Sequence, residues 1–341
     1  MIRGNEIIYQ IFVRNYSEEG TFQAVQIDLP RLKRLGVDII YLMPIHKIGV
    51  KNRKGTWGSP YAIKDYYSIS HDLGTKEDFV SLINATHQAG MRIIMDMVFN
   101  HTSPDSLVLK HHPEYYFYKD DKLGNRVGDW SDIIDLDTNR EDTQAYLLDV
   151  LRYWRSLGVD GFRFDVASMI SLDFFKKARK ELGKDIIFFA ESIDYDFADY
   201  LRSMGYSSTP DIDMFPTFDL LYNYSWFRSL EKYLKHEITF ENLKAIIDED
   251  YKYIGNKGLR VICFENHDTE RIASFVYEDK LEEIVLDLVK LKGPLFLYMG
   301  QEYGISHRPN LFEKDPVSWK PNKKVLEIYK EAIDIKKHMI G

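Results

Sequence analysis

Short apolar runs alternate with longer amphipathic stretches along this chain of 341 residues. Eight apolar runs have the length of buried strands, and they cover residues 6–12, 38–44, 92–99, 161–166, 185–191, 214–219, 259–265 and 294–299. Apolar positions at helical spacing predict helices over residues 22–35, 77–89, 141–157, 174–182, 280–291 and 323–338. A glycine follows each of the first four helices, as is common where a helix stops.

Strands that alternate with helices predict parallel βαβ units, so the fold class is α/β. Eight such repeats favour a closed (β/α)8 TIM barrel over an open sheet of unusual width. The run at 214–219 has the weakest strand pattern of the eight.

The connection between the third strand and the helix that begins at Glu141 is unusually long. It spans about 40 residues, far more than an ordinary βα loop. We therefore expect residues 1–100 to form the first part of the barrel, 101–140 a small insert beside its mouth, and 141–341 the second part. No linker and no C-terminal β-sandwich domain is visible in the sequence.

Charge and composition narrow the classes of partner. The chain has 45 Lys and Arg against 53 Asp and Glu, a net charge of −8, which disfavours nucleic acid and anionic membranes. No run of about 18 apolar residues predicts a membrane span, and no signal peptide is visible, so a cytoplasmic location is expected. The single cysteine, Cys263, excludes an intrachain disulfide.

Charged residues stand at the ends of several predicted strands. Arg163 and Asp165 alternate with Phe162, Phe164 and Val166, so they point together into the barrel while the apolar side chains face the helices. This pair is either a structural ion pair or part of an active site. Barrel active sites lie at the carboxyl ends of strands, where Asp165 is found, and this favours function.

Two more strands end in the same way. Glu191 closes the apolar run 185–191, where desolvation would keep it protonated as a general acid; the alternative is a solvated residue at a helix start. The seventh strand ends in Asn266, His267 and Asp268. A histidine at a strand end is usually only a hydrogen-bonded polar residue, but four strands that end in polar groups indicate a common site.

These segments resemble the four signature regions of the α-amylase family, family 13 of the glycoside hydrolases. The similar segments are residues 96–101 (DMVFNH), 161–166 (GFRFDV), Glu191 and 266–268 (NHD). Residues 58–61 with 65–66, and residues 293–302, are similar to further parts of the family pattern. The ordered set covers nearly the whole chain.

The resemblance implies a role for each matching residue. Asp165 would be the nucleophile, Glu191 the general acid and base, and Asp268 the carboxylate that binds sugar hydroxyls and stabilises the transition state. The supporting residues would bind the substrate: Arg163 would hold Asp165 ionised, His101 and His267 would form hydrogen bonds with the same sugar ring, and Tyr61 would stack on it. The substrate would be an α-glucan or maltooligosaccharide, cleaved at α-1,4 bonds with net retention.

Calcium, common in the family, is not favoured here. Ser168 and Met169 stand where many amylases have Lys-His, so no metal ligand is assigned and no cofactor is expected to be required, although Asn100 and Asp132 could contribute to a calcium site. The family also usually adds a β-sandwich domain after the barrel.

Several alternatives stay open. The same scaffold serves 4-α-glucanotransferases and α-glucosidases. A non-catalytic barrel binding protein would have lost at least one of the three carboxylates, and an enzyme of phosphorylated sugars would need a glycine-rich phosphate loop after strand seven or eight. The sequence is silent on oligomeric state.

Overall fold

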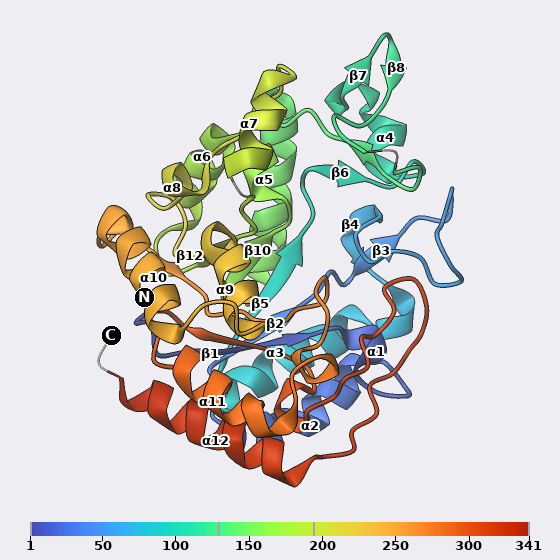
Figure 1. Ribbon diagram of the computed structural model, residues 1–341. Coiled ribbons are helices and arrows are strands. Elements are labelled where there is room, and N and C mark those ends of the chain that lie inside the picture. Colours follow the sequence, from blue (N-terminus) through green and yellow to red (C-terminus); the bar gives the residue numbers. More distant parts are fainter. Residues whose placement is uncertain (1, 129, 194, 340–341) are drawn as a thin grey trace.

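The computed structural model describes residues 2–128, 130–193 and 195–339. Its main sheet has eight parallel strands in the order β13-β12-β11-β10-β5-β2-β1-β14 (Figure 1). The strands are β1 (Ile7–Ile11), β2 (Ile39–Leu42), β5 (Arg92–Met97), β10 (Gly161–Phe164), β11 (Ile187–Ala190), β12 (Leu220–Leu221), β13 (Leu259–Arg260) and β14 (Leu295–Tyr298). A parallel bridge between Ile262 and Leu295 joins the two edges. The chain therefore forms a (β/α)8 barrel.

The sixth strand lies later in the chain than the sequence predicts. Helix α8 (Asp211–Met214) occupies the start of the predicted run, and β12 begins only at Leu220. The apolar side chains are buried all the same: the ring of Phe218 lies 4.7 Å from that of Phe175. The prediction over 214–219 was wrong because a short apolar run reports burial and does not separate a strand from an apolar turn.

Six helices match the predicted ones to within a few residues. They are α2 (Phe22–Leu35), α3 (Lys76–Gln88), α5 (Glu141–Ser156), α6 (Leu172–Leu182), α11 (Glu278–Leu288) and α12 (Lys323–His338). Local signals explain their ends: Thr75 and Asp78 form a capping box at the start of α3, and Gly36 ends α2 with a φ of 101°. Within the described ranges, three further helices of eight or more residues were not predicted, namely α7 (Tyr195–Ser203), α9 (Phe227–Leu234) and α10 (Phe240–Ile254).

Two apolar layers hold the barrel together. Phe162 and Phe164 belong to the outer layer between strands and helices, as the alternation along β10 predicts. The inner layer fills the barrel with side chains such as Tyr41, Phe189 and Phe296. Arg163 points into this interior and is 0% exposed, so its charged guanidinium is buried among apolar side chains.

Short elements flank the mouth of the barrel. β3 (His46–Ile48) pairs with β4 (Ile63–Ile69), and helix α1 (Val13–Tyr16) follows β1. Between β5 and α5 lie β6 (His101–Thr102), α4 (Leu107–His111), β7 (Tyr118–Lys119), β8 (Lys122–Leu123) and β9 (Ile134–Asp135). Figure 1 shows the β7–β8 hairpin projecting away from the barrel. No helix in the described ranges is long and apolar enough to cross a membrane.

Candidate active site

Adjacent strands bring Asp165 and Glu191 together. In the pairing of β10 with β11, Phe164 lies opposite Ala190, so the two carboxylates follow in the same register. The backbone N–H of Glu191 donates to the Phe164 carbonyl at 3.0 Å and continues that pairing. Both side chains therefore leave the barrel at its carboxyl end, where the sequence predicts them.

A single guanidinium connects three carboxylates. Nη1 of Arg163 donates to Asp96 at 2.8 Å and to Asp165 at 3.0 Å, and Nη2 lies 3.0 Å from Glu191 Oε2. Asp96 is 0% exposed and also accepts hydrogen bonds from the hydroxyls of Tyr41 at 2.7 Å and Tyr61 at 3.2 Å. Arg163 therefore has more negative neighbours than it can neutralise.

This excess of negative charge changes the protonation of Asp165. Burial raises the pKa of Asp165 well above its usual value, the Glu191 carboxylate raises it further, and Arg163 offsets only part of the rise. Arg163 lowers the pKa of Asp165, as the sequence predicts, but burial and the carboxylates of Glu191 and Asp96 outweigh it, so the net shift is upward. The physical reason is that Arg163 is shared with Asp96 and Glu191.

Glu191 lies among polar donors more than among apolar side chains. Its Oε2 accepts a hydrogen bond from the backbone N–H of Val166 at 2.7 Å as well as the contact with Arg163, and its side chain is 15% exposed. Val166 has a φ of 43°, an unusual value for a β-branched residue, and it lines the pocket beside Glu191 instead of facing the helices. The left-handed turn directs this N–H at the carboxylate.

Asp268 belongs to a second cluster with His267 and Tyr61. His267 Nε2 lies 3.0 Å from Asp268 and 2.6 Å from the Tyr61 hydroxyl, and the Tyr61 and His267 rings stack at 5.4 Å. Gln10 from β1 contacts the other ring nitrogen at 2.9 Å. Burial alone would raise the pKa of Asp268, but His267, together with Arg163 and Arg308, lowers it below its usual value, so the carboxyl stays ionised.

His101 is the remaining predicted ligand of the substrate. It is buried, and desolvation lowers its pKa to about 4 although Asp132 and the Tyr61 backbone favour the charged form. The imidazole is therefore neutral near pH 7 and can donate one hydrogen bond and accept one. The structure thus brings Asp165, Glu191 and Arg163 into one contact network and Asp268, His267 and Tyr61 into another, joined by Asp96 and Tyr61.

Comparison with known proteins identifies the family. Residues 10–130 and 126–339 match the family model "Alpha amylase, catalytic domain", which covers nearly the whole chain. The chain belongs to the α-amylase family of glycoside hydrolases.

Solved structures of this family superpose closely. An α-amylase from Lactobacillus plantarum has a TM-score of 0.93 and 38% identity, with 98% of this chain and 80% of that chain covered. The noncanonic maltogenic α-amylase AmyB from Thermotoga neapolitana has a TM-score of 0.88 and 30% identity, with 98% and 77% covered.

Curated relatives are more distant and longer. The α-amylase MalA of Haloarcula japonica is 27% identical over 92% of this chain, which covers only 46% of that protein. The chain therefore spans about half the length of this relative. Others, 23% to 27% identical, are named oligo-1,6-glucosidase, α-glucosidase, trehalose-6-phosphate hydrolase and intracellular maltogenic amylase.

Some residues of this α-amylase-family site had no role in the sequence argument. Asp96 accepts hydrogen bonds from Arg163 and Tyr41, and Gln10 contacts His267. A carboxylate inside the apolar run 92–99 and an amide inside 6–12 were visible signals, because polar groups within buried strands need a partner. Tyr41 carries no such signal, because a tyrosine is ordinary in a buried strand.

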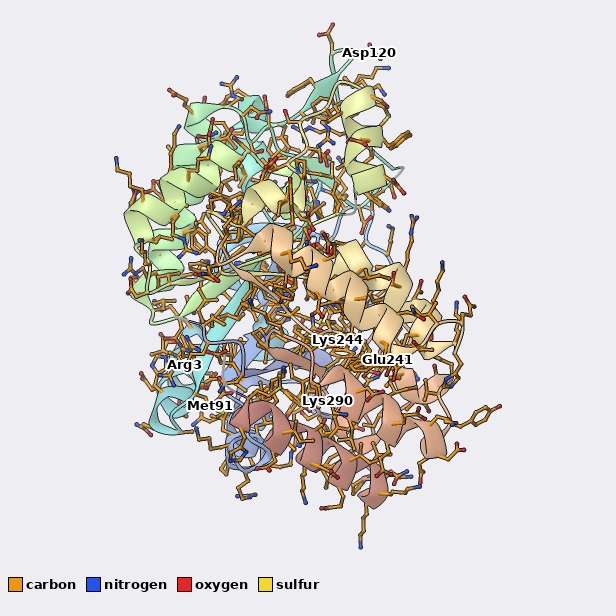
Figure 2. The ribbon with its side chains drawn as sticks, turned by 60° about the vertical axis from the view of Figure 1, so that its left-hand side comes forward. Arg3, Met91, Asp120, Glu241, Lys244 and Lys290 are labelled. Atoms are coloured by element: carbon orange, nitrogen blue, oxygen red, sulfur yellow. The ribbon has the colours of Figure 1, made fainter. Side chains whose placement is uncertain are left out.

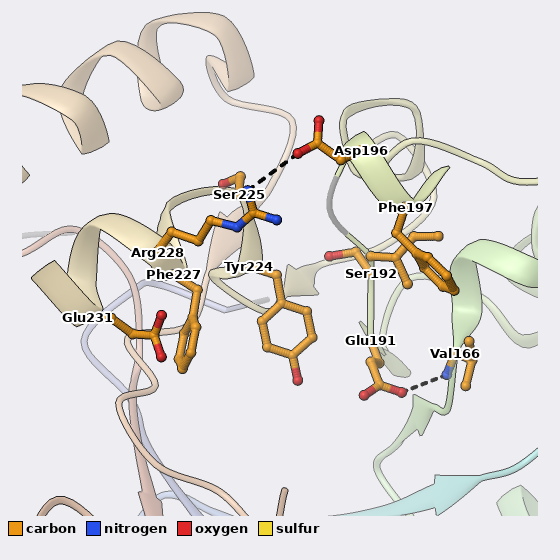
Figure 3. Close-up of a pocket in the computed structure, with 11 residues that line it drawn as sticks. Val166, Glu191, Ser192, Asp196, Phe197, Tyr224, Ser225, Phe227, Arg228 and Glu231 are labelled. Carbon is orange, nitrogen blue, oxygen red and sulfur yellow. Dashed lines mark hydrogen bonds and ion pairs between the residues drawn. The ribbon is translucent and has the colours of Figure 1, made fainter. Parts of the chain in front are cut away.

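A pocket of about 580 Å³ opens beside Glu191 (Figure 3). Tyr224 and Phe227 line it, and Tyr224 stacks on the buried ring of Tyr222 at 5.1 Å. Trp226 and Phe227 are adjacent aromatic residues in the sequence, and an exposed ring of either kind can stack on a sugar. Only Phe227 lies in the pocket, because Trp226 is 1% exposed and belongs to the core.

The two residues that could contribute to a calcium site, Asn100 and Asp132, lie in different surroundings. Asp132 is paired with the ammonium of Lys54 at 2.8 Å, so a protein cation already stands beside this carboxylate. Among the described residues, no group of three or more His, Cys, Asp or Glu side chains could hold a metal ion. The buried side-chain oxygen Oδ1 of Asn100 has no hydrogen-bond partner in the described part of the chain. One amide oxygen does not make a calcium site.

Proposed function

We propose that this chain is a retaining glycoside hydrolase that cleaves α-1,4-glucosidic bonds of α-glucans or maltooligosaccharides. The observation that carries the proposal is the placement of Asp165 and Glu191 on neighbouring strand ends, bound to the two terminal nitrogens of Arg163. Retaining glycosidases need two carboxyl groups about 5–5.5 Å apart. Adjacent strands lie about 4.8 Å apart, so side chains at neighbouring strand ends are compatible with that separation.

The three carboxylates would have separate tasks. Asp165 would attack the anomeric carbon and form the glycosyl-enzyme, while Glu191 protonates the leaving oxygen and then activates water. Asp268, ionised beside His267, would bind hydroxyls of the same ring and stabilise the positive charge of the transition state. Tyr61 and the neutral His101 would complete the binding of that ring.

The crowded charges at Arg163 affect which carboxyl group of the pair holds the proton. Asp165 holds a proton to higher pH than an isolated carboxyl does. A retaining mechanism needs one proton in the pair, on Glu191 at the moment of attack. We place it there in the substrate complex, because the leaving oxygen lies at Glu191 and the anomeric carbon at Asp165.

The acceptor decides between the hydrolase and its alternatives. Water gives hydrolysis, whereas a sugar hydroxyl gives 4-α-glucanotransfer, and an α-glucosidase would release single glucose units. The pocket beside Glu191, with the rings of Tyr224 and Phe227, is where a leaving or accepting sugar would bind. We retain the hydrolase as the leading proposal.

Neighbouring segments receive roles in the same proposal. Residues 101–140, which carry His101, would form one wall of the cleft as a small insert domain. No cofactor is proposed to be required. A cytoplasmic location is supported by one relative, the intracellular maltogenic amylase of Bacillus subtilis.

Substitution of the nucleophile tests the proposal directly. Asp165→Asn should abolish turnover of maltoheptaose, because the amide cannot form the glycosyl ester. The matched control Asp185→Asn changes an exposed carboxylate at the other end of the barrel and should keep wild-type turnover. Near wild-type activity in Asp165→Asn would remove this residue from the mechanism.

The products test the stereochemistry and the acceptor. Proton NMR should detect the α anomer first, and a β anomer would overturn the retaining mechanism. Digestion of maltotriose through maltoheptaose should give only shorter sugars, whereas products longer than the substrate would identify a transferase.

A further inference from the structure

A second cavity lies at the end of the barrel opposite Asp165. It has a volume of about 500 Å³, and residues before β1, β13 and β14 and at the ends of α10 and α12 line it. These are the amino-terminal ends of the strands, whereas the proposed active site is at their carboxyl ends. Its volume falls in the range of small-molecule sites.

The charge of this cavity is opposite to that of the chain. The described lining has five cationic residues against one acidic residue, Asp248, although the chain as a whole has a net charge of −8. The cations are Arg3, Lys244, Lys290, Lys292 and Lys336. Figure 2 shows Lys244 and Lys290 near each other at this end of the molecule.

Lys336 is the unusual member of the group. Its side chain is 0% exposed, and its ammonium donates one hydrogen bond, of 2.6 Å, to the Leu291 carbonyl. An ammonium has three donors, and the described residues place no carboxylate within ion-pair distance of it. Burial lowers the pKa of Lys336 to about 8, because desolvation disfavours the charged ammonium.

Two other lysines have carboxylate partners. Lys244 pairs with Asp248, and Lys290 lies 3.2 Å from Asp287. Lys292 is exposed, and its ammonium lies 4.7 Å from the Tyr251 ring without a carboxylate among the described residues. Lys292 and Lys336 thus leave positive charge in the cavity after the ion pairs are formed.

Helix ends offer a simpler reason for lysines here. The carbonyl ends of α10 and α12 face this side of the barrel, and cations stabilise such ends. That explanation accounts for the exposed lysines. It does not account for the buried Lys336, whose ammonium has two donors without a partner in the described part of the chain.

We propose that this cavity binds a small oxyanion, a phosphate or carboxylate group, whose oxygens contact Lys336 and Lys292. The apolar side chains of Ile247 and Leu291, which also line the cavity, would contact the organic part that carries the anion. Such a ligand would supply a counterion to Lys336, which has none among the described residues. The site is independent of the glycosidase proposal.

Titration calorimetry of the whole chain tests the site, with sodium phosphate and sodium butyrate as probes and sodium chloride at equal ionic strength as reference. At least one oxyanion should bind saturably and raise Tm. Phosphate alone would identify a phosphate ligand, and butyrate alone a carboxylate with an apolar body. Binding of neither probe beyond chloride would overturn the proposal.

Substitutions assign the binding to the cavity. Lys336→Met keeps the length of the side chain, removes its charge, and should weaken binding about tenfold or more. Lys292→Met, at an exposed position that tolerates change, should weaken it about threefold even if Lys336→Met folds poorly. Lys330→Met, on the exposed side of α12, is the matched control and should bind as wild type does. Unchanged binding in both cavity variants would place the anion elsewhere and refute the site.

Discussion

Asp96→Asn is the substitution that most directly tests the charge balance at Arg163. Asp96 and Asp165 both accept from Nη1 of Arg163, at 2.8 and 3.0 Å, so their oxygens lie within about 6 Å of each other. The change keeps the shape of residue 96 and removes one of three negative charges. It therefore separates the charge of Asp96 from its packing.

The expected loss of stability follows from burial. Removal of one partner from a buried pair costs about 3–5 kcal/mol. Arg163 keeps Asp165 and Glu191 as partners, so we expect the lower end, about 3 kcal/mol, or a fall in Tm of roughly 5 °C for a chain of this size.

The activity should respond in a direction that packing alone does not predict. Two like charges about 6 Å apart interact by about 3 kcal/mol at an effective dielectric constant of 20. The negative charge of Asp96 raises the pKa of Asp165, so its removal should lower that pKa. The acidic limb of kcat/KM should therefore move to lower pH by about one to two units. We expect kcat itself to fall about 100-fold, because Arg163 and Tyr61 lose a positioning partner.

The assay is the pH profile of kcat/KM on maltoheptaose, with Tm measured in the same buffers. Asp219→Asn is the matched control, since it removes a carboxylate that pairs with Arg179 at 2.7 Å at the opposite end of the barrel. It should lower Tm without moving the limb. A limb that stays in place or moves to higher pH in Asp96→Asn would refute the charge argument.

Three further predictions concern other parts of the molecule. Tyr224→Ala should raise KM for maltotriose about tenfold by removing a wall of the sugar pocket, whereas Trp226→Ala should instead cost about 3–5 kcal/mol of stability, because this ring is buried in the core. Burial lowers the pKa of His46 to about 3, so only the unfolded chain takes up a proton below pH 6.5, and stability falls as the pH falls. His46→Leu should remove about 2 kcal/mol of the loss between pH 6.5 and 5 in urea denaturation, while the exposed His71→Leu should not. Treatment with EDTA should leave activity unchanged, and a loss restored by calcium would refute the assignment of no metal.

Local pattern was sufficient for the order of elements and for the identity of the reacting groups. Strand and helix periods differ, so alternation along 161–166 already separated the inward Arg163 from the outward Phe162 and Phe164. Glycines after four helices marked their ends. Parallel strands share one carboxyl edge, so polar residues at the ends of different strands had to meet at one mouth of the barrel. The site residues could therefore be named before any distance was known.

Tertiary structure decided what depends on several distant segments at once. The number of carboxylates around Arg163 comes from three different strands, and it reversed the expected direction of the Asp165 pKa. The apolar side chains of the run 214–219 are buried, but its backbone forms a turn and no strand. Burial depends on the neighbouring side chains, whereas a strand depends on the backbone conformation. Contacts between distant segments also determine three further features: the burial of Trp226, the left-handed backbone at Val166 and the cationic cavity beside Lys336. Sequence periodicity reports which way a side chain points, whereas charge balance and cavity shape are sums over neighbours that only the folded chain brings together.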